Sequence, residues 1–425
     1  MRIERDSMGE MEVPEDALFG AQTRRAQLNF DVSGWPMPVG VVHALGRIKA
    51  AAAVVNHALE RLDAGRSALV EQAAREVADG RHDEQFVVDL FQTGSGTSSN
   101  MNANEVIANR AIQLAGGVIG SRDPVHPNDH VNLGQSSNDV IPTAIQVAAA
   151  VTITGDLLPA LQTLEATLLA RARAFDDVVT LGRTHLQDAT PIRLGQVFGG
   201  YAAQVARGRA QLSHALEELY ALPIGGTAVG TGVNTHPEFG GRVAEVLSRE
   251  TGLEFVEASN HFSAQATADV FIIAMGALKA AALGLAKIAN DIRFLASGPR
   301  GGLGEITLPA VQPGSSIMPG KVNPVMAESL MQVTGWIVGA DASVTWASSM
   351  LSNFELSAAQ PLIAHQLLES IRLLAAATRN FEERAVRGLS ADSVRCSELV
   401  EQSLALGTSL APLIGYDAAA ALVKE

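Results

Sequence analysis

Apolar residues recur at helical spacing over five long stretches of the chain, and polar, turn-forming segments separate several of them. Apolar residues spaced by three and four positions are typical of helices that bury one face. A pattern in which apolar and polar residues alternate, as in strands, is almost absent. The chain is therefore predicted to be mainly all-α, with a central bundle of long helices. The five stretches are 140–174, 191–222, 261–295, 326–347 and 360–386.

Shorter helical segments fill the first third of the chain, and a short helical part follows the last long stretch. These changes in pattern predict three domains. An N-terminal helical domain covers 1–136, a central long-helix bundle covers 137–392, and a short C-terminal domain covers 393–425.

Composition favours closely packed helices over a β-sandwich. Of the 425 residues, 47% are hydrophobic but only 4% are aromatic, so alanine, leucine, valine and glycine supply most of the apolar mass. A sandwich would need more aromatic and β-branched residues. The formal net charge of −14 argues against nucleic acid as a partner, because nucleic-acid-binding proteins present a basic surface. An anionic substrate remains compatible with this charge, since a local site can be positive on an acidic protein.

The chain has one cysteine, Cys396, so no intrachain disulfide can form, as expected in a reducing compartment. The first six residues are charged and lack the apolar run of a secretory signal. The apolar stretch 270–289 contains Lys279 and Lys287, which a membrane span would rarely carry. We therefore expect a cytoplasmic protein without a membrane partner. Apolar faces of this length also predict a homo-oligomer whose bundles pack together.

The segment 314–324, Gly-Ser-Ser-Ile-Met-Pro-Gly-Lys-Val-Asn-Pro, carries the strongest chemical signal. Its glycines and prolines exclude a helix interior or a central strand, so it is predicted to be a loop. Two hydroxyls, one cation and one amide suggest a device that holds or deprotonates a small anion. A phosphate-binding P-loop is excluded because five residues separate the glycines and Val322 follows Lys321.

Two further clusters, 93–104 and 135–139, are rich in hydroxyl and amide side chains, and each lies just before or at the start of a helical stretch. Such residues serve either as ordinary helix N-caps or as donors to a bound anion. For either cluster alone, helix capping and anion binding are about equally well supported. Because the chain has two such clusters, carboxylate binding is favoured.

The segment 182–191 is a turn-forming stretch in which His185 is the one side chain that titrates near neutral pH. It is a candidate acid or base, although a lone histidine is more often structural. Glu328 lies one helical turn beyond Pro324 and could face the loop, or could simply favour the helix dipole. His126 and His130 have a spacing that zinc ligands can have, but no further ligand pair supports a metal, so none is predicted.

Taken together, these clusters resemble the fumarase/aspartase superfamily over nearly the whole chain, and segment 314–324 matches its signature loop. Within it the chain is most similar to the class II fumarases. Ser95 is the most telling residue, because aspartases typically read Gly-Ala-Gly-Thr-Ser in that cluster. The other matching segments are 2–6, 19–23, 93–97, 126–129, 135–139, 182–191, 225–232 and 287–293.

The resemblance implies a three-domain subunit and a homotetramer with a twenty-helix core, in which three subunits build each active site. It implies reversible anti addition of water to fumarate, giving L-malate through an aci-carboxylate carbanion, with no metal or organic cofactor. An aspartate ammonia-lyase, or a lyase for a related succinyl compound, is the alternative. A catalytically silent structural homologue would be expected to lack the loop serine, the lysine or the histidine. All three are present, so this alternative is disfavoured.

The resemblance also implies residue roles. Ser316 would be the base that removes the C3 proton, and Lys321 with Asn323 would stabilise the negative charge that develops. His185, paired with Glu328 of another subunit, would position water and protonate the leaving hydroxide. The substrate-binding residues would be Ser95, Thr97, Ser136, Ser137, Asn138, Thr184 and Asn323. A secondary dicarboxylate site would comprise His126, Asn128 and Asp129.

The chain departs from the family pattern at several positions. Asp123 stands where the family usually has arginine, Gly134 replaces the usual serine, Ser357 replaces an amide, and Gln360 replaces a lysine or methionine. By comparison with the family, the C-terminal domain is expected to be short and to lack a final small helical subdomain. These departures bear on substrate optimum and efficiency more than on reaction class.

Overall fold

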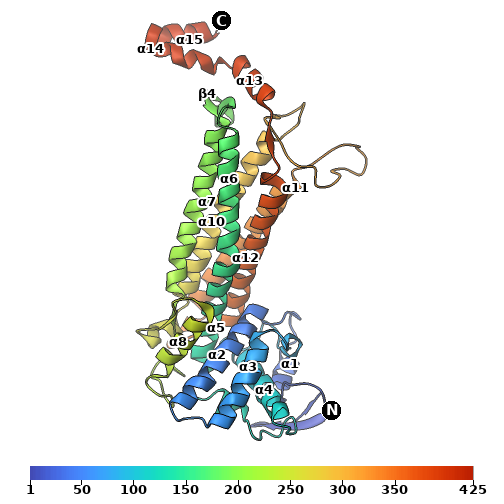
Figure 1. Cartoon of the computed structure of the whole chain (residues 1–425), viewed down its shortest axis with the longest axis vertical. Coiled ribbons are helices and arrows are strands. Elements are labelled where there is room, and N and C mark those ends of the chain that lie inside the picture. The colour runs from blue at the N-terminus through green and yellow to red at the C-terminus, as the bar shows by residue number, and fades with distance from the viewer. Residues whose placement is uncertain (425) are drawn as a thin grey trace. The chain divides into compact units, whose positions relative to one another are not determined.

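The structure, a computed structural model, describes residues 1–424, and the chain divides into two compact units. Unit 1 comprises 1–155, 213–278 and 338–372, and unit 2 comprises 156–212, 279–337 and the residues from 373 onward. Both units are built mainly from helices, with only short two-stranded sheets among residues 1–424, so the predicted mainly all-α fold is confirmed (Figure 1). The division into three domains remains a prediction.

Unit 1 packs short helices at close range. Gly46 of α2 lies so near α3 that an added Cβ would sit 2.5 Å from the backbone nitrogen of Ala78, so a larger residue there would separate the two helices. Buried Glu105 of α4 accepts backbone hydrogen bonds from Gly20, Gln22 and Thr23, and so caps the start of α1. The helices wholly in this unit are α1 (Ala21–Asn29), α2 (Val39–Ala58), α3 (Ala64–Ala78), α4 (Thr97–Leu114), α5 (Ser137–Thr152), α8 (Phe239–Thr251) and α9 (His261–Ala266).

Four long helices contribute residues to both units, and α6 (Leu158–Ala174) lies in unit 2 (Figure 1). The long helices are α7 (Leu194–Glu218), α10 (Asp269–Leu295), α11 (Val325–Met350) and α12 (Gln360–Phe381). They correspond to four of the predicted apolar stretches. The fifth, 140–174, forms α5 and α6 with a π-helical turn at Ile153–Leu157 between them. The chain continues with α13 (Ser393–Gln402), α14 (Ala411–Ile414) and α15 (Tyr416–Lys424).

The strands are short and pair two by two. In unit 1, β1 (Arg2–Asp6) pairs with β2 (Gly9–Val13), β5 (Ala221–Leu222) with β6 (Val256–Glu257), and β8 (Ser352–Asn353) with β9 (Leu356–Ser357). In unit 2, β3 (Val179–Thr184) pairs with β4 (Gln187–Arg193), and β7 (Ile306–Thr307) with β10 (Ser390–Ala391). All of these pairs except β5–β6 are antiparallel.

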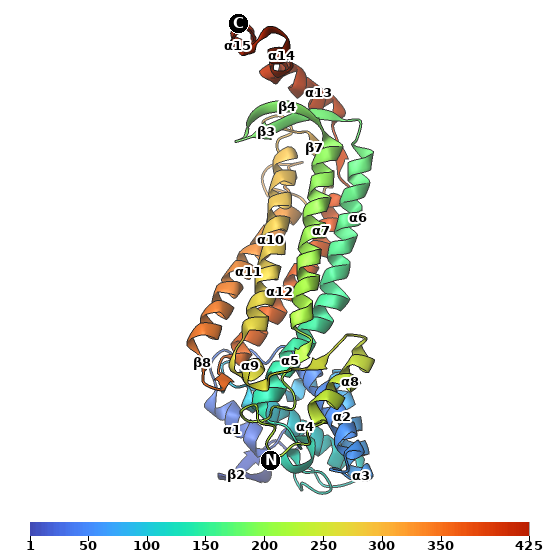
Figure 2. The ribbon, with the colours of Figure 1, turned by 90° about the vertical axis from the view of Figure 1, so that its left-hand side faces the viewer.

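The description of 182–191 as a turn-forming stretch is wrong in part, because most of it belongs to the antiparallel β3–β4 hairpin (Figure 2). The segment contains glycine, proline and aspartate, which are uncommon in strands, so the sequence alone predicts a turn there. The turn itself comprises only two residues. Three smaller corrections concern helix bounds. Helix α4 begins at Thr97, within the polar cluster 93–104, the stretch 261–295 is interrupted between α9 and α10, and α7 begins at Leu194.

By length and composition alone, three helical segments could cross a membrane: Val39–Ala58, Ser137–Ala174 and Asp269–Leu295. In the first two, 72% and 61% of the most apolar window is buried inside the protein, against 39% in the third. Since less than half of the third window is buried, α10 has an uncovered apolar face in the single chain. A membrane span would rarely carry Lys279 and Lys287, so this face is expected to contact protein and not lipid.

Candidate active site

The first predicted cluster lies at the N-terminus of α4. Gly96 has a left-handed φ of 72° and directly precedes the helix, so the chain turns sharply there. The hydroxyls of Ser95 and Thr97 lie 2.7 Å apart and share one hydrogen bond. One hydroxyl hydrogen of this pair is therefore left to donate to a ligand.

The second cluster forms the start of α5. Ser136 is the N-cap, and it exchanges hydrogen bonds with the first turn: its hydroxyl accepts from the backbone of Asn138, and Asp139 accepts from its backbone nitrogen at 2.9 Å. The other carboxylate oxygen of Asp139 accepts from the backbone of Gly225 and Thr227 at 3.1 and 2.9 Å. This carboxylate thus fixes the glycine-rich segment 225–232 against the helix start.

The two clusters meet within unit 1. An added Cβ on Gly96 would lie 2.9 Å from the side chain of Ile141 in α5, so no larger residue fits there without a shift. The side-chain amide of Asn100, in α4, donates to the hydroxyl of Ser137 at 3.0 Å. Two helix N-termini with neutral donors therefore lie side by side, an arrangement suited to a carboxylate group.

Lys49 of α2 also belongs to this region, although no sequence motif points to it. Its side chain is fully buried, and its ammonium donates to the Oδ1 of Asn132 at 2.9 Å. Burial lowers the pKa of Lys49, opposed by the nearby carboxylate of Asp139, and burial likewise raises the pKa of Asp139. A sequence signal existed: the positions three and four residues away on both sides are leucine, glycine and alanine, which places Lys49 on the buried face.

The predicted secondary site lies around a π-helical turn at Pro127–Val131. The Nδ1 of His126 accepts from the backbone nitrogens of Asn128 and Asp129, both at 3.2 Å. Burial lowers the pKa of His126, so the neutral ring carries its hydrogen on Nε2. That hydrogen is the group that could donate to a carboxylate here.

In unit 2, His185 lies at the tip of the β3–β4 hairpin, which crosses the ends of α7 and α10 (Figure 2). Thr184 pairs with Gln187, so His185 and Leu186 form a two-residue turn, and their φ angles are 56° and 62°. Positive φ at both central positions is the requirement of a type I′ turn. Thr184 and His185 are both exposed.

The base of this hairpin is held by a buried carboxylate. Glu305 has no exposed side-chain surface and accepts from Arg183 at 2.6 Å, and also from the hydroxyl of Thr180. Arg183 directly precedes Thr184. The ion pair therefore holds the strand that carries His185.

The signature loop 314–324 is closed by its own hydrogen bonds. Gly314 donates to the carbonyl of Lys321 at 2.7 Å, and the side-chain amide of Asn323 donates to the carbonyl of Gly314 at 2.8 Å. The hydroxyl of Ser315 accepts from the backbone of Ile317 and Met318 at 3.2 and 3.1 Å. Ser316 and Lys321 are both exposed. The two adjacent serines thus differ: Ser315 shapes the loop, and Ser316 is presented to solvent.

Glu328 lies in the first turn of α11 and is also exposed. Within the described part of unit 2, no hydrogen bond or ion pair joins Thr184 or His185 to Ser316, Lys321 or Glu328. The predicted pairing of His185 with Glu328 is therefore not made inside one chain.

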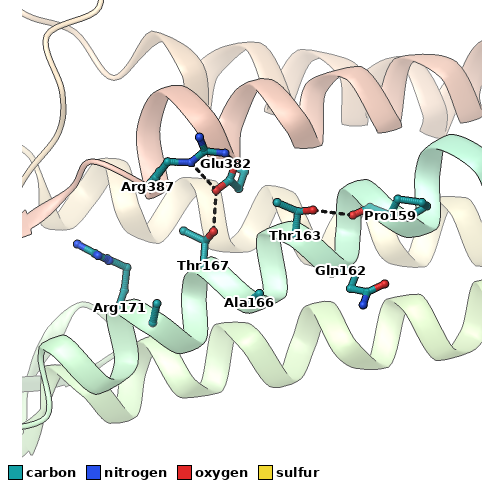
Figure 3. Close-up of a pocket in the computed structure, with 9 residues that line it drawn as sticks. Pro159, Gln162, Thr163, Ala166, Thr167, Arg171, Glu382 and Arg387 are labelled. Carbon is teal, nitrogen blue, oxygen red and sulfur yellow. Dashed lines mark hydrogen bonds and ion pairs between the residues drawn. The ribbon is translucent and has the colours of Figure 1, made fainter.

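Two cavities of unit 2 differ in their relation to these residues. One of about 560 Å³ lies beside the hairpin and is lined by His185 together with Tyr201, Lys287, Asn290 and Asp291. The other, of about 570 Å³, lies between α6 and the end of α12 (Figure 3). Its buried Glu382 already accepts from Thr167 and Arg387, and no predicted site residue lines it, so it is not a candidate site.

Comparison with known proteins places this geometry in a family. A family described as lyase matches residues 9–339. Fumarate hydratase class II 2 of Bradyrhizobium diazoefficiens is 52% identical over 423 residues, covering 100% of this chain and 89% of the relative. Fumarate hydratase class II of Nitrosomonas europaea is 50% identical over 424 residues, covering 100% of this chain and 92% of that protein.

Solved structures agree. The class II fumarase of Schistosoma mansoni superposes with a TM-score of 0.98 at 41% identity, over 100% of this chain and 92% of that one. The fumarate lyase:delta crystallin of Brucella melitensis, in its native form, superposes with a TM-score of 0.92 at 44% identity, over 100% of this chain and 96% of that one. Similarity at this level along the whole of the chain leads to one conclusion: it belongs to the class II fumarate hydratases of the lyase family.

Proposed function

We propose that the chain hydrates fumarate reversibly to L-malate by anti addition, through an aci-carboxylate carbanion. The observation that carries the proposal is the pair of helix N-termini in unit 1, where Ser95, Thr97, Ser136, Ser137 and Asn138 supply neutral donors for a carboxylate. Hydratase activity is the first choice because relatives of about 50% identity over the full chain are named fumarate hydratases. The alternative is an ammonia-lyase, which would require ammonium for the same substrate.

In this proposal Ser316 takes the proton from C3 of malate, and the electron pair left on carbon delocalises into the neighbouring carboxylate. A serine hydroxyl is a weak base at its ordinary pKa, so it needs nearby positive charge and backbone donors. Lys321 supplies the positive charge in the same loop, and it also stabilises the dianion together with Asn323. Because one amide hydrogen of Asn323 closes the loop on Gly314, its second hydrogen is the one left for substrate.

His185 completes the reaction by positioning water for hydration, and by protonating hydroxide as it leaves C2 in the reverse direction. Glu328 of another subunit would orient its imidazole, and Thr184 would contact the substrate carboxylate. Fumarate would also bind, through its carboxyl groups, at the secondary site formed by His126, Asn128 and Asp129. In this proposal the side chains named and the backbone donors of the loop fill these roles.

A purified-protein assay tests the proposal directly. Absorbance of fumarate should fall without ammonium and malate should form, whereas loss that requires ammonium would favour the ammonia-lyase. Ser316→Ala should lower kcat by about 10²–10⁴-fold, the usual contribution of a general base. Ser315→Ala is the matched control, since it removes a neighbouring hydroxyl that only accepts backbone hydrogen bonds, and it should cost far less. Near-normal turnover in Ser316→Ala would overturn the assigned base.

We further propose a homotetramer in the cytoplasm whose active sites combine residues of three subunits. Large apolar side chains on two long helices are exposed in the single chain, among them Ile273, Leu283, Phe294, Trp336 and Trp346. Exposed apolar surface of this kind favours association with further copies. Each active site would then obtain its serine loop and its His185 hairpin from different subunits.

Subunit mixing tests this assembly. His185→Asn and Ser316→Ala tetramers should each be nearly inactive. Dissociating and reassembling them together should restore part of the activity, because some mixed sites receive both intact residues. No recovery in tetramers proven to be mixed would place both residues of a site on one subunit.

A further inference from the structure

Lys49 has no role in the mechanism above, yet it lies fully buried in the middle of α2. An ammonium group loses its hydration when it is buried, and a well-packed apolar residue of similar volume often stabilises a protein as well or better. Methionine would fill the same space without that cost. The fold alone therefore does not explain a lysine at this position, and its contacts must be considered.

The first contact orients Asn132. Lys49 donates to the Oδ1 of Asn132 at 2.9 Å, and the Nδ2 of Asn132 donates to the backbone carbonyl of Gln135 at 3.1 Å. An ammonium can only donate and a carbonyl can only accept. The two ends of the Asn132 amide are thus assigned by their partners.

The second contact, made by Asn100, links Asn132 to Ser137 in the proposed substrate-binding cluster. The Nδ2 of Asn100 donates to the Oδ1 of Asn132 at 3.2 Å and to the hydroxyl of Ser137 at 3.0 Å. The opposite orientation of Asn100 would place two acceptor oxygens against each other. Ser137 is therefore an acceptor toward Asn100, and among residues 1–424 nothing accepts its own hydrogen.

We propose that Lys49 is a positioning residue, which through Asn132 and Asn100 keeps the hydroxyl of Ser137 as a donor toward a substrate carboxylate. The inference rests on the proposed function, because that function assigns Ser137 to carboxylate binding. Without the buried ammonium, Asn132 can reverse its amide, Asn100 can follow, and Ser137 can turn its hydrogen inward.

A competing explanation is that Lys49 only neutralises Asp139. Asp139 already accepts from the backbone of Ser136, Gly225 and Thr227, which satisfies a large part of its hydrogen-bonding capacity. The two explanations differ in what Ser137 contributes. A purely structural lysine acts independently of that hydroxyl, whereas a positioning lysine acts through it.

A double-mutant cycle on the KM for fumarate separates them, with Lys49→Met, Ser137→Ala and the double variant. We expect Lys49→Met to raise KM about tenfold, as loss of one well-directed hydrogen bond to a charged group would. The double variant should resemble Ser137→Ala alone, with kcat changed much less than KM in each. Additive effects of the two substitutions would overturn the proposal.

Asn100→Leu provides a second route if Lys49→Met does not fold. It removes the link to Ser137 but leaves Lys49 and Asp139 in place, and leucine is close to asparagine in shape. Asn100→Leu should raise KM by a similar factor. Combined with Ser137→Ala, it should raise KM no further than Ser137→Ala does alone. An unchanged KM in folded Asn100→Leu, checked by circular dichroism and oligomer mass, would contradict the relay.

The wild-type assay keeps this test apart from the proposed function. If wild type does not hydrate fumarate, the proposed function fails, and the same cycle is then measured as succinate affinity by calorimetry. Non-additive losses of succinate affinity would support the relay without hydration. Additive losses, or none, would overturn it.

Discussion

Replacing Glu305 by glutamine tests how the fold holds the hairpin that presents His185. The substitution keeps the size of the side chain but removes its charge from a site with no exposed surface. Arg183, whose side chain is 17% exposed, would then be left without its counter-ion. Breaking a buried ion pair from one side costs about 3–5 kcal/mol. Since glutamine can still accept one hydrogen bond and Arg183 reaches some water, we expect the lower end, about 3 kcal/mol.

The same hairpin offers a matched control. Arg193, the last residue of β4, pairs with Asp176 at 2.8 Å, but those side chains are 51% and 52% exposed. Exposed pairs contribute about 0–1 kcal/mol. Asp176→Asn should therefore cost less than about 1 kcal/mol, although the change in chemistry is the same.

The assay is urea unfolding followed by circular dichroism, with all variants at one protein concentration because the proposed association would contribute to stability. Glu305→Gln should lower the midpoint clearly and Asp176→Asn only slightly, without a change in slope. The kcat of Glu305→Gln should also fall, by up to about 10²-fold, since a small displacement of His185 would misplace the proposed acid–base group. Equal losses of stability in the two variants would refute the reasoning from burial.

Three further outcomes are expected. Gly94→Ala should destabilise the protein by about 1–3 kcal/mol or more in an unfolding experiment, because its Cβ would lie 1.9 Å from the carbonyl of Ala358. Arg110 holds the pKa of Glu76 below its ordinary value, so this pair stabilises the fold above about pH 4.3 and loses that effect as pH falls through the lowered pKa. Glu76→Gln should accordingly flatten the acid side of a plot of unfolding free energy against pH. Lys321→Met should reduce kcat by about 10²–10³-fold, as expected if Lys321 stabilises transition-state charge as proposed, while oligomer mass by light scattering stays constant.

The long helices were predictable because burial of one face repeats along the sequence. The stretch 326–347 corresponds to α11 at Val325–Met350 with only a few residues of difference at its ends. Helix α7 starts three residues later than its stretch because Pro191–Arg193 pairs as a strand with β3. Helical periodicity does not reveal this hairpin, because the strand is short and contains proline and aspartate, which are uncommon in strands.

The sequence proposes a set of site residues but not their arrangement, and the catalytic roles of these residues remain predictions. The resemblance of short motifs selects Ser316 and His185, whereas only the structure separates the loop-shaping Ser315 from its exposed neighbour. Lys49 was missed because a lysine in an apolar helix normally extends its ammonium to water. Its burial depends on the chain around Asn132, more than eighty residues away in the sequence.

The two-residue turn at His185 and Leu186 has a consequence for anyone who alters the histidine. Asparagine tolerates a left-handed backbone well, whereas a β-branched residue does so poorly. Slow turnover in His185→Val could therefore result either from the missing imidazole or from a distorted hairpin. His185→Asn separates the two causes, since it removes the proposed proton donor while the peptide keeps its left-handed backbone.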